Sequence, residues 1–103
     1  MAINQSAAIT AQATWTTSMY LIGWFNISVY TPSGAVGTLG GTTVTVQRSF
    51  NNGTTWLDVK QYTATAEEYG FEPEGATYRI GVKATQYTAA VNVRIGTEPG
   101  MTK

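Results

Sequence analysis

The feature that most limits how this chain can fold is a repeated alternation of apolar and polar residues. In the longest alternating run, residues 19–30, every odd position from Met19 to Val29 is apolar or glycine. Successive side chains of a β-strand point to opposite faces of the sheet, so a period of two indicates strands with one buried face. No segment repeats its apolar residues convincingly with the period of a helix. The sequence therefore predicts an all-β protein.

Shorter alternating runs define the other strands. These are expected over residues 9–15, 43–50, 55–60, 77–84 and 89–95, with a short strand and then an acidic connection in residues 61–76. Asn52-Gly53 predicts a hairpin between its flanking runs, because both residues tolerate positive φ. The short connection 85–88 predicts a second hairpin. Six to seven strands with frequent turns are typical of a small antiparallel β-sandwich or barrel, either jelly-roll-like or immunoglobulin-like.

The first half of the longest strand is apolar at even positions as well. Tyr20, Ile22 and Trp24 occupy these positions, so we expect this half to be buried on both faces. Gly23 predicts a β-bulge or a close backbone approach. Tyr20, Trp24 and Tyr30 share the even face and are candidate partner contacts. Core filling or a subunit contact is the expected role of these rings, and a platform for sugar stacking is the alternative.

The two ends of the chain carry weaker patterns than its middle. With 103 residues the chain can build one core but not two, so residues 1–103 are expected to form a single domain. Residues 1–8 are small and polar, and we expect a mobile arm that becomes ordered by adding a strand to a neighbouring protein. Ile3 and Ile9 would anchor that arm. Residues 97–103 show no pattern and are expected to be a flexible tail.

Charge and missing residue types restrict the function. Only 12% of residues are charged and the formal net charge is zero, so the chain lacks the positive field that nucleic-acid binding requires. It has no Cys and no His, which removes thiol nucleophiles, disulfides and the most common general base. Its longest apolar run, residues 19–25, is too short to span a bilayer. We expect a protein that is not an enzyme and binds no cofactor, metal, nucleic acid or membrane.

Four glutamates gather in one segment, at Glu67, Glu68, Glu72 and Glu74. A glycosidase needs two carboxylates held across a sugar cleft, and a calcium loop needs oxygen ligands at regular spacing. The segment contains Pro and Gly and lacks the calcium spacing. We therefore expect a solvated surface loop here.

The clearest motif lies at the first predicted hairpin. Ser49-x-Asn51-x-Gly53-x-Thr55-Trp56 resembles the Asp-box of sialidase-type propellers, with Asn in place of Asp. The Asn oxygen can accept hydrogen bonds from turn amides, while the Gly takes positive φ and the Trp packs beneath the turn. A propeller repeats its blades, and one copy cannot build it. The motif is therefore expected to hold a hairpin tip closed, without a catalytic role.

A longer pattern resembles a group of small structural proteins of tailed bacteriophages. In that group a valine-rich strand enters an R-S-F-x-x-G-x-T-W hairpin, and the strands Y-R-[IL]-G-V-K and V-N-V-R follow. Here these elements lie at residues 48–56, 78–83 and 91–94, with Tyr87 in the turn between the last two. The resemblance covers residues 42–96.

This resemblance implies a non-enzymatic virion protein, made in the bacterial cytoplasm, that decorates the capsid surface. Its partners would be the phage major capsid protein, whose adjacent subunits it would staple, and further copies of itself. The candidate contacts to these partners are Ile3, Ile9, Tyr20, Trp24 and Tyr30. The alternative is a carbohydrate- or receptor-binding module of a phage tail, which requires the aromatic face to be exposed.

Overall fold

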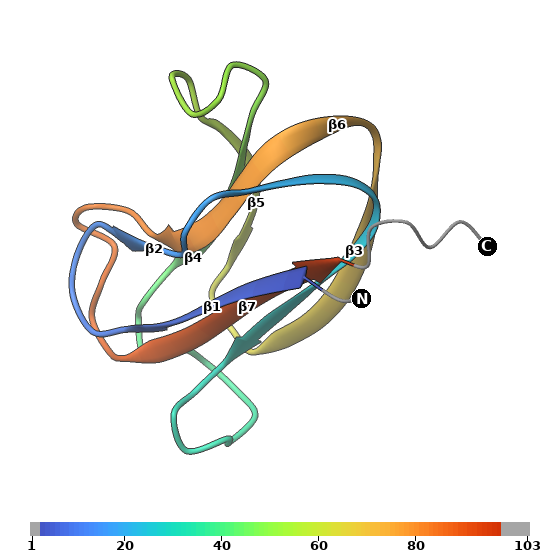
Figure 1. Ribbon diagram of the computed structural model, residues 1–103. Helices are drawn as coiled ribbons and strands as arrows, with labels where there is room; N and C mark the ends of the chain where they lie inside the picture. Colours follow the sequence, from blue (N-terminus) through green and yellow to red (C-terminus); the bar gives the residue numbers. More distant parts are fainter. Residues whose placement is uncertain (1–2, 98–103) are drawn as a thin grey trace.

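The computed structural model describes residues 3–97, and all regular secondary structure in this range is β-strand (Figure 1). The strands are β1 (Ile3–Ile9), β2 (Thr14–Trp15), β3 (Met19–Tyr30), β4 (Val44–Ser49), β5 (Leu57–Tyr62), β6 (Ala66–Val82) and β7 (Val91–Thr97). Every strand pairing is antiparallel, which confirms the predicted fold class. In this part of the chain no helix is long and apolar enough to cross a membrane.

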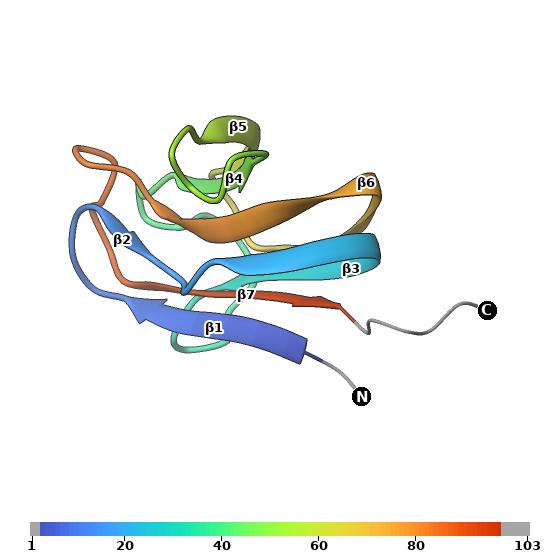
Figure 2. The same cartoon turned by 45° about the horizontal axis from the view of Figure 1, so that its top comes forward.

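The strands form one sheet in the order β1-β7-β3-β6-β4-β5, with β2 beside β6. The sheet bends along β3 and β6, so that β4 and β5 lie on one side of β6, and β7 and β1 on the other side of β3 (Figure 2). At the bend Ile22 alone lies opposite the three β6 residues 73–75. Gly23 (φ 89°) and Gly75 (φ 87°) take positive φ there, which glycine adopts without strain. The bulge predicted at Gly23 is confirmed.

The bent sheet encloses a single apolar core. The odd positions of β3 face this core as predicted, apart from the half-buried Gly23. The core residues are Ile9, Met19, Leu21, Phe25, Ile27, Val29, Leu39, Val44, Val46, Tyr62, Ala76, Tyr78, Ile80, Val82, Val91, Val93 and Ile95. Each large aliphatic side chain buried in this way contributes about 1.5–3 kcal/mol, so the cluster is the main source of stability.

The expected N-terminal arm is instead a strand of the sheet. Residues 3–9 pair with β7 over seven positions, from Ile3 opposite Thr97 to Ile9 opposite Val91. Ile9 is fully buried in the core, so its proposed role as a partner contact is wrong. The prediction failed because it weighed only the polarity of the arm. An edge strand needs few apolar side chains when a neighbouring strand satisfies its backbone.

Other parts of the sequence prediction also differ from the structure. The run expected over residues 9–15 is broken by a turn, in which Ala13 has a φ of 53°. The prediction of a second hairpin, between the last two strands, is wrong because β7 pairs with β1 and β3, and not with β6. Thr97, expected to begin a flexible tail, is the last residue of β7 and donates a hydrogen bond to the Trp24 carbonyl (2.8 Å). Residues 98–103 lie outside the described range. The first hairpin, between β4 and β5, is confirmed.

The expected acidic loop is the first half of β6. Residues 66–72 pair with β3, and one of the four glutamates, Glu72, is almost fully buried at 1% exposure. Alternation was present here in the exposed Tyr69 and Phe71, but the neighbouring glutamates, Pro73 and glycines outweighed it in the prediction. Pro73 is accommodated because it lies at the bend, where the register shifts and β3 offers no partner.

Candidate functional site

The most prominent surface feature is an aromatic face that spans β3 and β6. Tyr20, Ile22 and Trp24 of β3 are 64%, 50% and 64% exposed, so the prediction that this half of the strand is buried on both faces is wrong. Tyr69 (78%) and Phe71 (54%) of β6 lie on the same face. We call these five residues the aromatic face.

Cross-strand pairing holds the rings of the aromatic face together. Trp24 lies opposite Phe71 in the β3–β6 register, with ring centroids 5.0 Å apart and ring planes 62° apart. The Trp24 and Tyr69 rings are 5.7 Å apart and tilted by 56°. Such tilted aromatic pairs are favourable beyond their buried area. Trp24 is thus the centre of a preformed apolar cluster that remains open to solvent.

The bend of the sheet fixes Tyr20 at one end of this face. A Cβ on Gly75 would lie 2.0 Å from the Tyr20 hydroxyl oxygen, so the ring occupies the space that the glycine leaves. Tyr30, at the other end of β3, is 39% exposed and lines a cavity of about 320 Å³. Val29, the loop residues 34–36 and residues 65–67 at the start of β6 form the rest of its lining. Of the predicted contacts, Tyr20, Trp24 and Tyr30 are therefore accessible. Ile3 lies at the start of β1, and its side chain is outside the described set.

Sequence reasoning missed Tyr69 and Phe71 as members of the site. The missing information was the β3–β6 register, which places Trp24 opposite Phe71 and Asn26 opposite Tyr69. Their spacing of two residues was a usable signal. It was discounted because the segment was assigned to a loop.

The Asp-box-like motif closes the β4–β5 hairpin as predicted. Asn51 Oδ1 accepts a hydrogen bond from the Thr55 amide (2.8 Å), and Ser49 Oγ accepts one from the Gly53 amide (2.8 Å). Gly53 has a φ of 88° and lies against the Trp56 ring, which a Cβ at this position would approach to 3.2 Å. The side chains of Ser49 and Asn51 therefore keep the turn closed by binding its backbone amides.

We expect Gly53→Ala to lower the free energy of unfolding by more than about 1–2 kcal/mol, the cost of placing a Cβ at positive φ. The excess should come from the contact with the Trp56 ring. Gly34→Ala is the matched control, because Gly34 has a φ of 81° and no atom within 4 Å of the added Cβ. Urea unfolding of both variants measures the difference. Equal losses would show that the ring places no constraint on residue 53.

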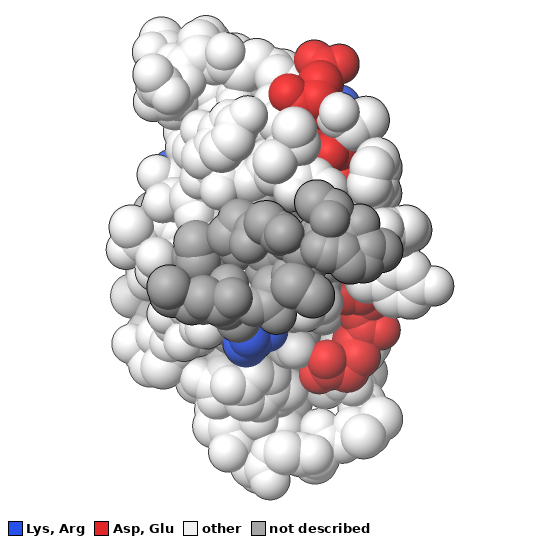
Figure 3. Space-filling model, turned by 45° about the vertical axis from the view of Figure 1, so that its right-hand side comes forward, with Lys and Arg blue, Asp and Glu red and all other residues white. Residues whose placement is uncertain are grey.

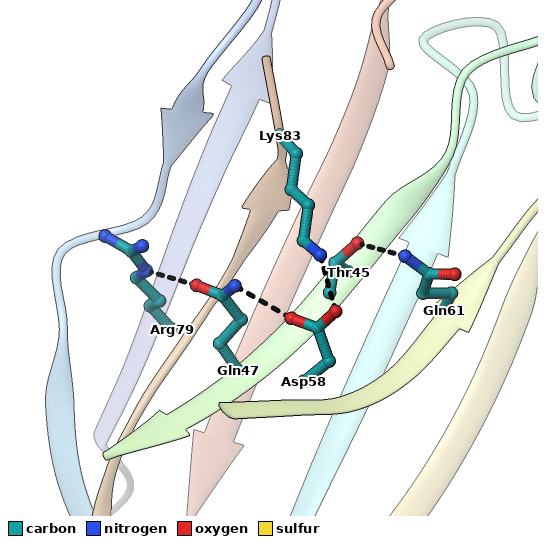
Figure 4. A network of polar contacts seen from close by, with 6 residues as sticks. All are labelled: Thr45, Gln47, Asp58, Gln61, Arg79 and Lys83. Carbon is teal, nitrogen blue, oxygen red and sulfur yellow. Dashed lines mark hydrogen bonds and ion pairs between the residues drawn. The ribbon is translucent and has the colours of Figure 1, made fainter. Parts of the chain in front are cut away.

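A polar network beside this hairpin covers the outer face of β4 (Figure 4). The Arg79 guanidinium lies between two indole rings, 4.1 Å from the Trp15 centroid and 4.2 Å from that of Trp56. Its Nε donates to Gln47 Oε1 (2.9 Å), and Gln47 Nε2 donates to Asp58 Oδ1 (2.9 Å). The hydrogen bond from Lys83 is the main cause that lowers the pKa of Asp58. These contacts hold β2, through Trp15, and the end of the β4–β5 turn, through Trp56, against the sheet.

A second buried polar group lies at the bend. Glu72 accepts hydrogen bonds from the Tyr78 hydroxyl (2.6 Å) and from Arg48 (3.2 Å). Burial raises the pKa of Glu72, but the bonds from Tyr78, the Glu74 amide and Arg48 outweigh it, and the net pKa lies below 4.5. Burial, together with the bond to Glu72, raises the pKa of Tyr78 to about 12. The Arg48–Glu72 contact joins the end of β4, just before the hairpin turn, to the bend in β6.

No set of three or more acidic, Cys or His side chains in residues 3–97 is placed to hold a metal ion. The described ion pairs join Arg48 to Glu72, Lys60 to Glu68 and Lys83 to Asp58. Glu72 is the buried member of these pairs, whereas the side chains of the other two pairs are a third or more exposed and contribute little to stability.

Compared with known protein families, curated proteins and solved structures, the chain shows no match. A functional proposal for this chain therefore rests on the surface chemistry of the domain and on the motif pattern of its sequence.

Proposed function

We propose that this protein is a non-enzymatic structural component of a bacteriophage virion, a capsid decoration protein that staples adjacent capsid subunits. The observation that carries the docking role is the aromatic face: five large apolar side chains of the β3–β6 pair, each at least half exposed, with the rings of Trp24, Tyr69 and Phe71 packed together. Contiguous exposed apolar surface marks interaction sites, and exposed Trp and Tyr are frequent among the residues that dominate binding energy. The capsid as the partner rests on the resemblance of residues 42–96 to small phage structural proteins.

Low charge supports a role in repeated docking between protein surfaces. The formal net charge is zero, and three of the basic side chains are used in internal ion pairs. A neutral surface does not repel further copies of itself on a lattice, and it carries little charge that binding would have to desolvate. The same neutrality disfavours nucleic acid as the partner.

We expect Trp24→Ser to weaken attachment to emptied, expanded capsids of the source phage by at least about tenfold, because truncating a central aromatic anchor commonly costs 1.4 kcal/mol or more. Cosedimentation over a range of protein concentrations gives the affinity. Leu57→Ser is the control, because Leu57 is a half-exposed apolar residue on β5, outside the aromatic face. Failure of the unaltered protein to attach, or equal weakening by both variants, would overturn the assignment.

A carbohydrate-binding module is the second candidate, and the exposure of Tyr20 and Trp24 is the observation that favours it. The ring geometry argues against it. A sugar ring stacks flat on an aromatic face, so a flat platform for several sugars needs neighbouring rings that are nearly coplanar. Tyr69 and Phe71 are tilted by 56° and 62° against Trp24. Quenching of Trp fluorescence by sugars, alongside a glycan array, separates the candidates: a response lost in Trp24→Ser would establish the carbohydrate role.

A further inference from the structure

One edge of the sheet lacks a strand partner where the core is close to the surface. Residues 66–72 of β6 pair with β3 on one side only, and β4 pairs with β6 no earlier than Thr77. Within residues 3–97 no strand pairs with the other side of this segment, which we call the free β6 edge. Its backbone N–H and C=O groups can therefore accept an added strand. Pro73, which has no N–H, ends this edge.

An apolar groove lies between the free β6 edge and β5. Its walls include Phe25 and Ile27 of β3, Val46 of β4 and Val59 of β5. Tyr62 and Lys60 reach across it to Glu68, with the Tyr62 hydroxyl donating to Glu68 (2.8 Å). Its volume of about 130 Å³ is well below the roughly 300–1,000 Å³ of small-molecule sites, and suits a side chain of an added strand better than a ligand.

The two faces of the free β6 edge offer different surroundings to such a strand. Inward-pointing side chains would enter the groove, and outward-pointing ones would lie beside Tyr69 and Phe71 of the aromatic face. Because side chains alternate along a strand, the fitting segment has apolar residues at every second position.

Charge decides which residues should occupy the other positions. The β6 segment 67–74 holds four of the six acidic residues of the chain. Within residues 3–97 two cations pair with them: Arg48 with Glu72, and Lys60 with Glu68. Four acids less two cations leave a local excess of two negative charges. Glu67 and Glu74 are exposed and have no cationic partner in the described part of the chain. Figure 3 shows acidic atoms in two groups along one margin of a mostly uncharged surface.

We infer that the free β6 edge is a strand-acceptor site for an extended protein segment that alternates apolar and basic residues. Backbone hydrogen bonds to residues 66–72 supply the pairing, the groove takes apolar side chains, and the exposed Glu67 attracts the basic ones. This inference is independent of the virion assignment, because it defines the partner by chemistry alone.

Synthetic peptides of about nine residues test this site directly. A peptide alternating Val and Lys should bind and should slow amide hydrogen exchange in residues 66–72, because added pairing protects the free β6 edge. A peptide alternating Val and Glu should bind at least several-fold more weakly. Glu67→Gln should raise the Kd of the Val/Lys peptide about two- to fivefold, as expected for an exposed ion pair.

Thr10→Lys is the matched control, since it also raises the net charge by one but lies in the turn after β1. It should leave the Kd unchanged. The inference is overturned if the Val/Lys peptide does not bind, if it binds without protecting residues 66–72, or if the Val/Glu peptide binds equally well. Thermal unfolding of each variant without peptide confirms that the fold is intact. Failure of the unaltered protein to attach to capsids, with binding of the Val/Lys peptide preserved, would overturn the virion proposal and leave this one standing.

Discussion

Ile9→Ala is expected to lower the free energy of unfolding by about 2–5 kcal/mol, the range for truncating a buried isoleucine. Ile9 is fully buried and lies opposite Val91, at the point where β1 joins the core. A loss of this size should reduce the Tm by at least about 8 °C in a domain of this length. Calorimetry or a thermal scan by circular dichroism measures it.

Ala8→Ser is the control for this variant, because Ala8 is the exposed neighbour on the same strand. It should change the stability by less than about 0.5 kcal/mol. Deleting residues 3–8 tests the whole strand, and it should also lower the Tm substantially, since it uncovers one edge of β7. An unchanged Tm after this deletion would contradict the role of residues 3–8 as a stabilising strand, and would support an independent arm.

Glu72→Gln is expected to reduce the free energy of unfolding at pH 7 by about 1.5–3 kcal/mol, the usual contribution of hydrogen bonds to a charged group. Gln keeps the shape of the side chain but loses the charge that faces Arg48 and the Tyr78 hydroxyl. Glu74→Gln removes the same charge from an exposed position nearby, and should have little effect. Urea unfolding of the two variants makes the comparison.

The pH dependence of Glu72 follows from the direction of its shift. Its folded-state pKa lies below its ordinary value of 4.5, so ionisation stabilises the folded protein above that pH. This stability is lost as the pH falls below 4.5 and through the folded-state pKa. Glu72→Gln should therefore flatten the acid side of the stability curve. Asp58 and Glu68, whose pKa values are also lowered, should keep some slope in both proteins. An equally steep acid loss in the variant would contradict the assignment of this slope to Glu72.

Tyr78 produces the opposite dependence at alkaline pH. Its pKa is raised from 10.0 to about 12, so its contribution is complete below pH 10 and is lost as the pH rises towards 12. Tyr78→Phe should reduce this alkaline loss, while Tyr62, whose pKa is also raised by burial, should add to it in both proteins. Stability measured between pH 9 and 12 tests the difference.

Local sequence determined those parts of the structure that depend on neighbouring residues. The bounds of β3 follow its alternation, and the β4–β5 hairpin follows Asn52-Gly53 and the side-chain bonds of Asn51 and Ser49. The bulge at Gly23 was also predictable, because glycine adopts positive φ without strain. In each case the cause lies within a few residues along the chain.

Only the tertiary structure decided which strands are neighbours and which faces are covered. Alternation shows that a strand has two faces, but not which strand lies beside it. The local sequence predicts a free arm over residues 1–8, whereas residues 3–9 pair with β7. It also predicts a solvated Glu72, whereas the bend brings this side chain to Tyr78 and Arg48. Likewise Trp24 could have filled the core. It lies in solvent beside Tyr69 and Phe71 because the β3–β6 register turns the even positions of β3 away from the single core. That choice depends on pairing between residues 37 or more positions apart, for which the local pattern carries no information.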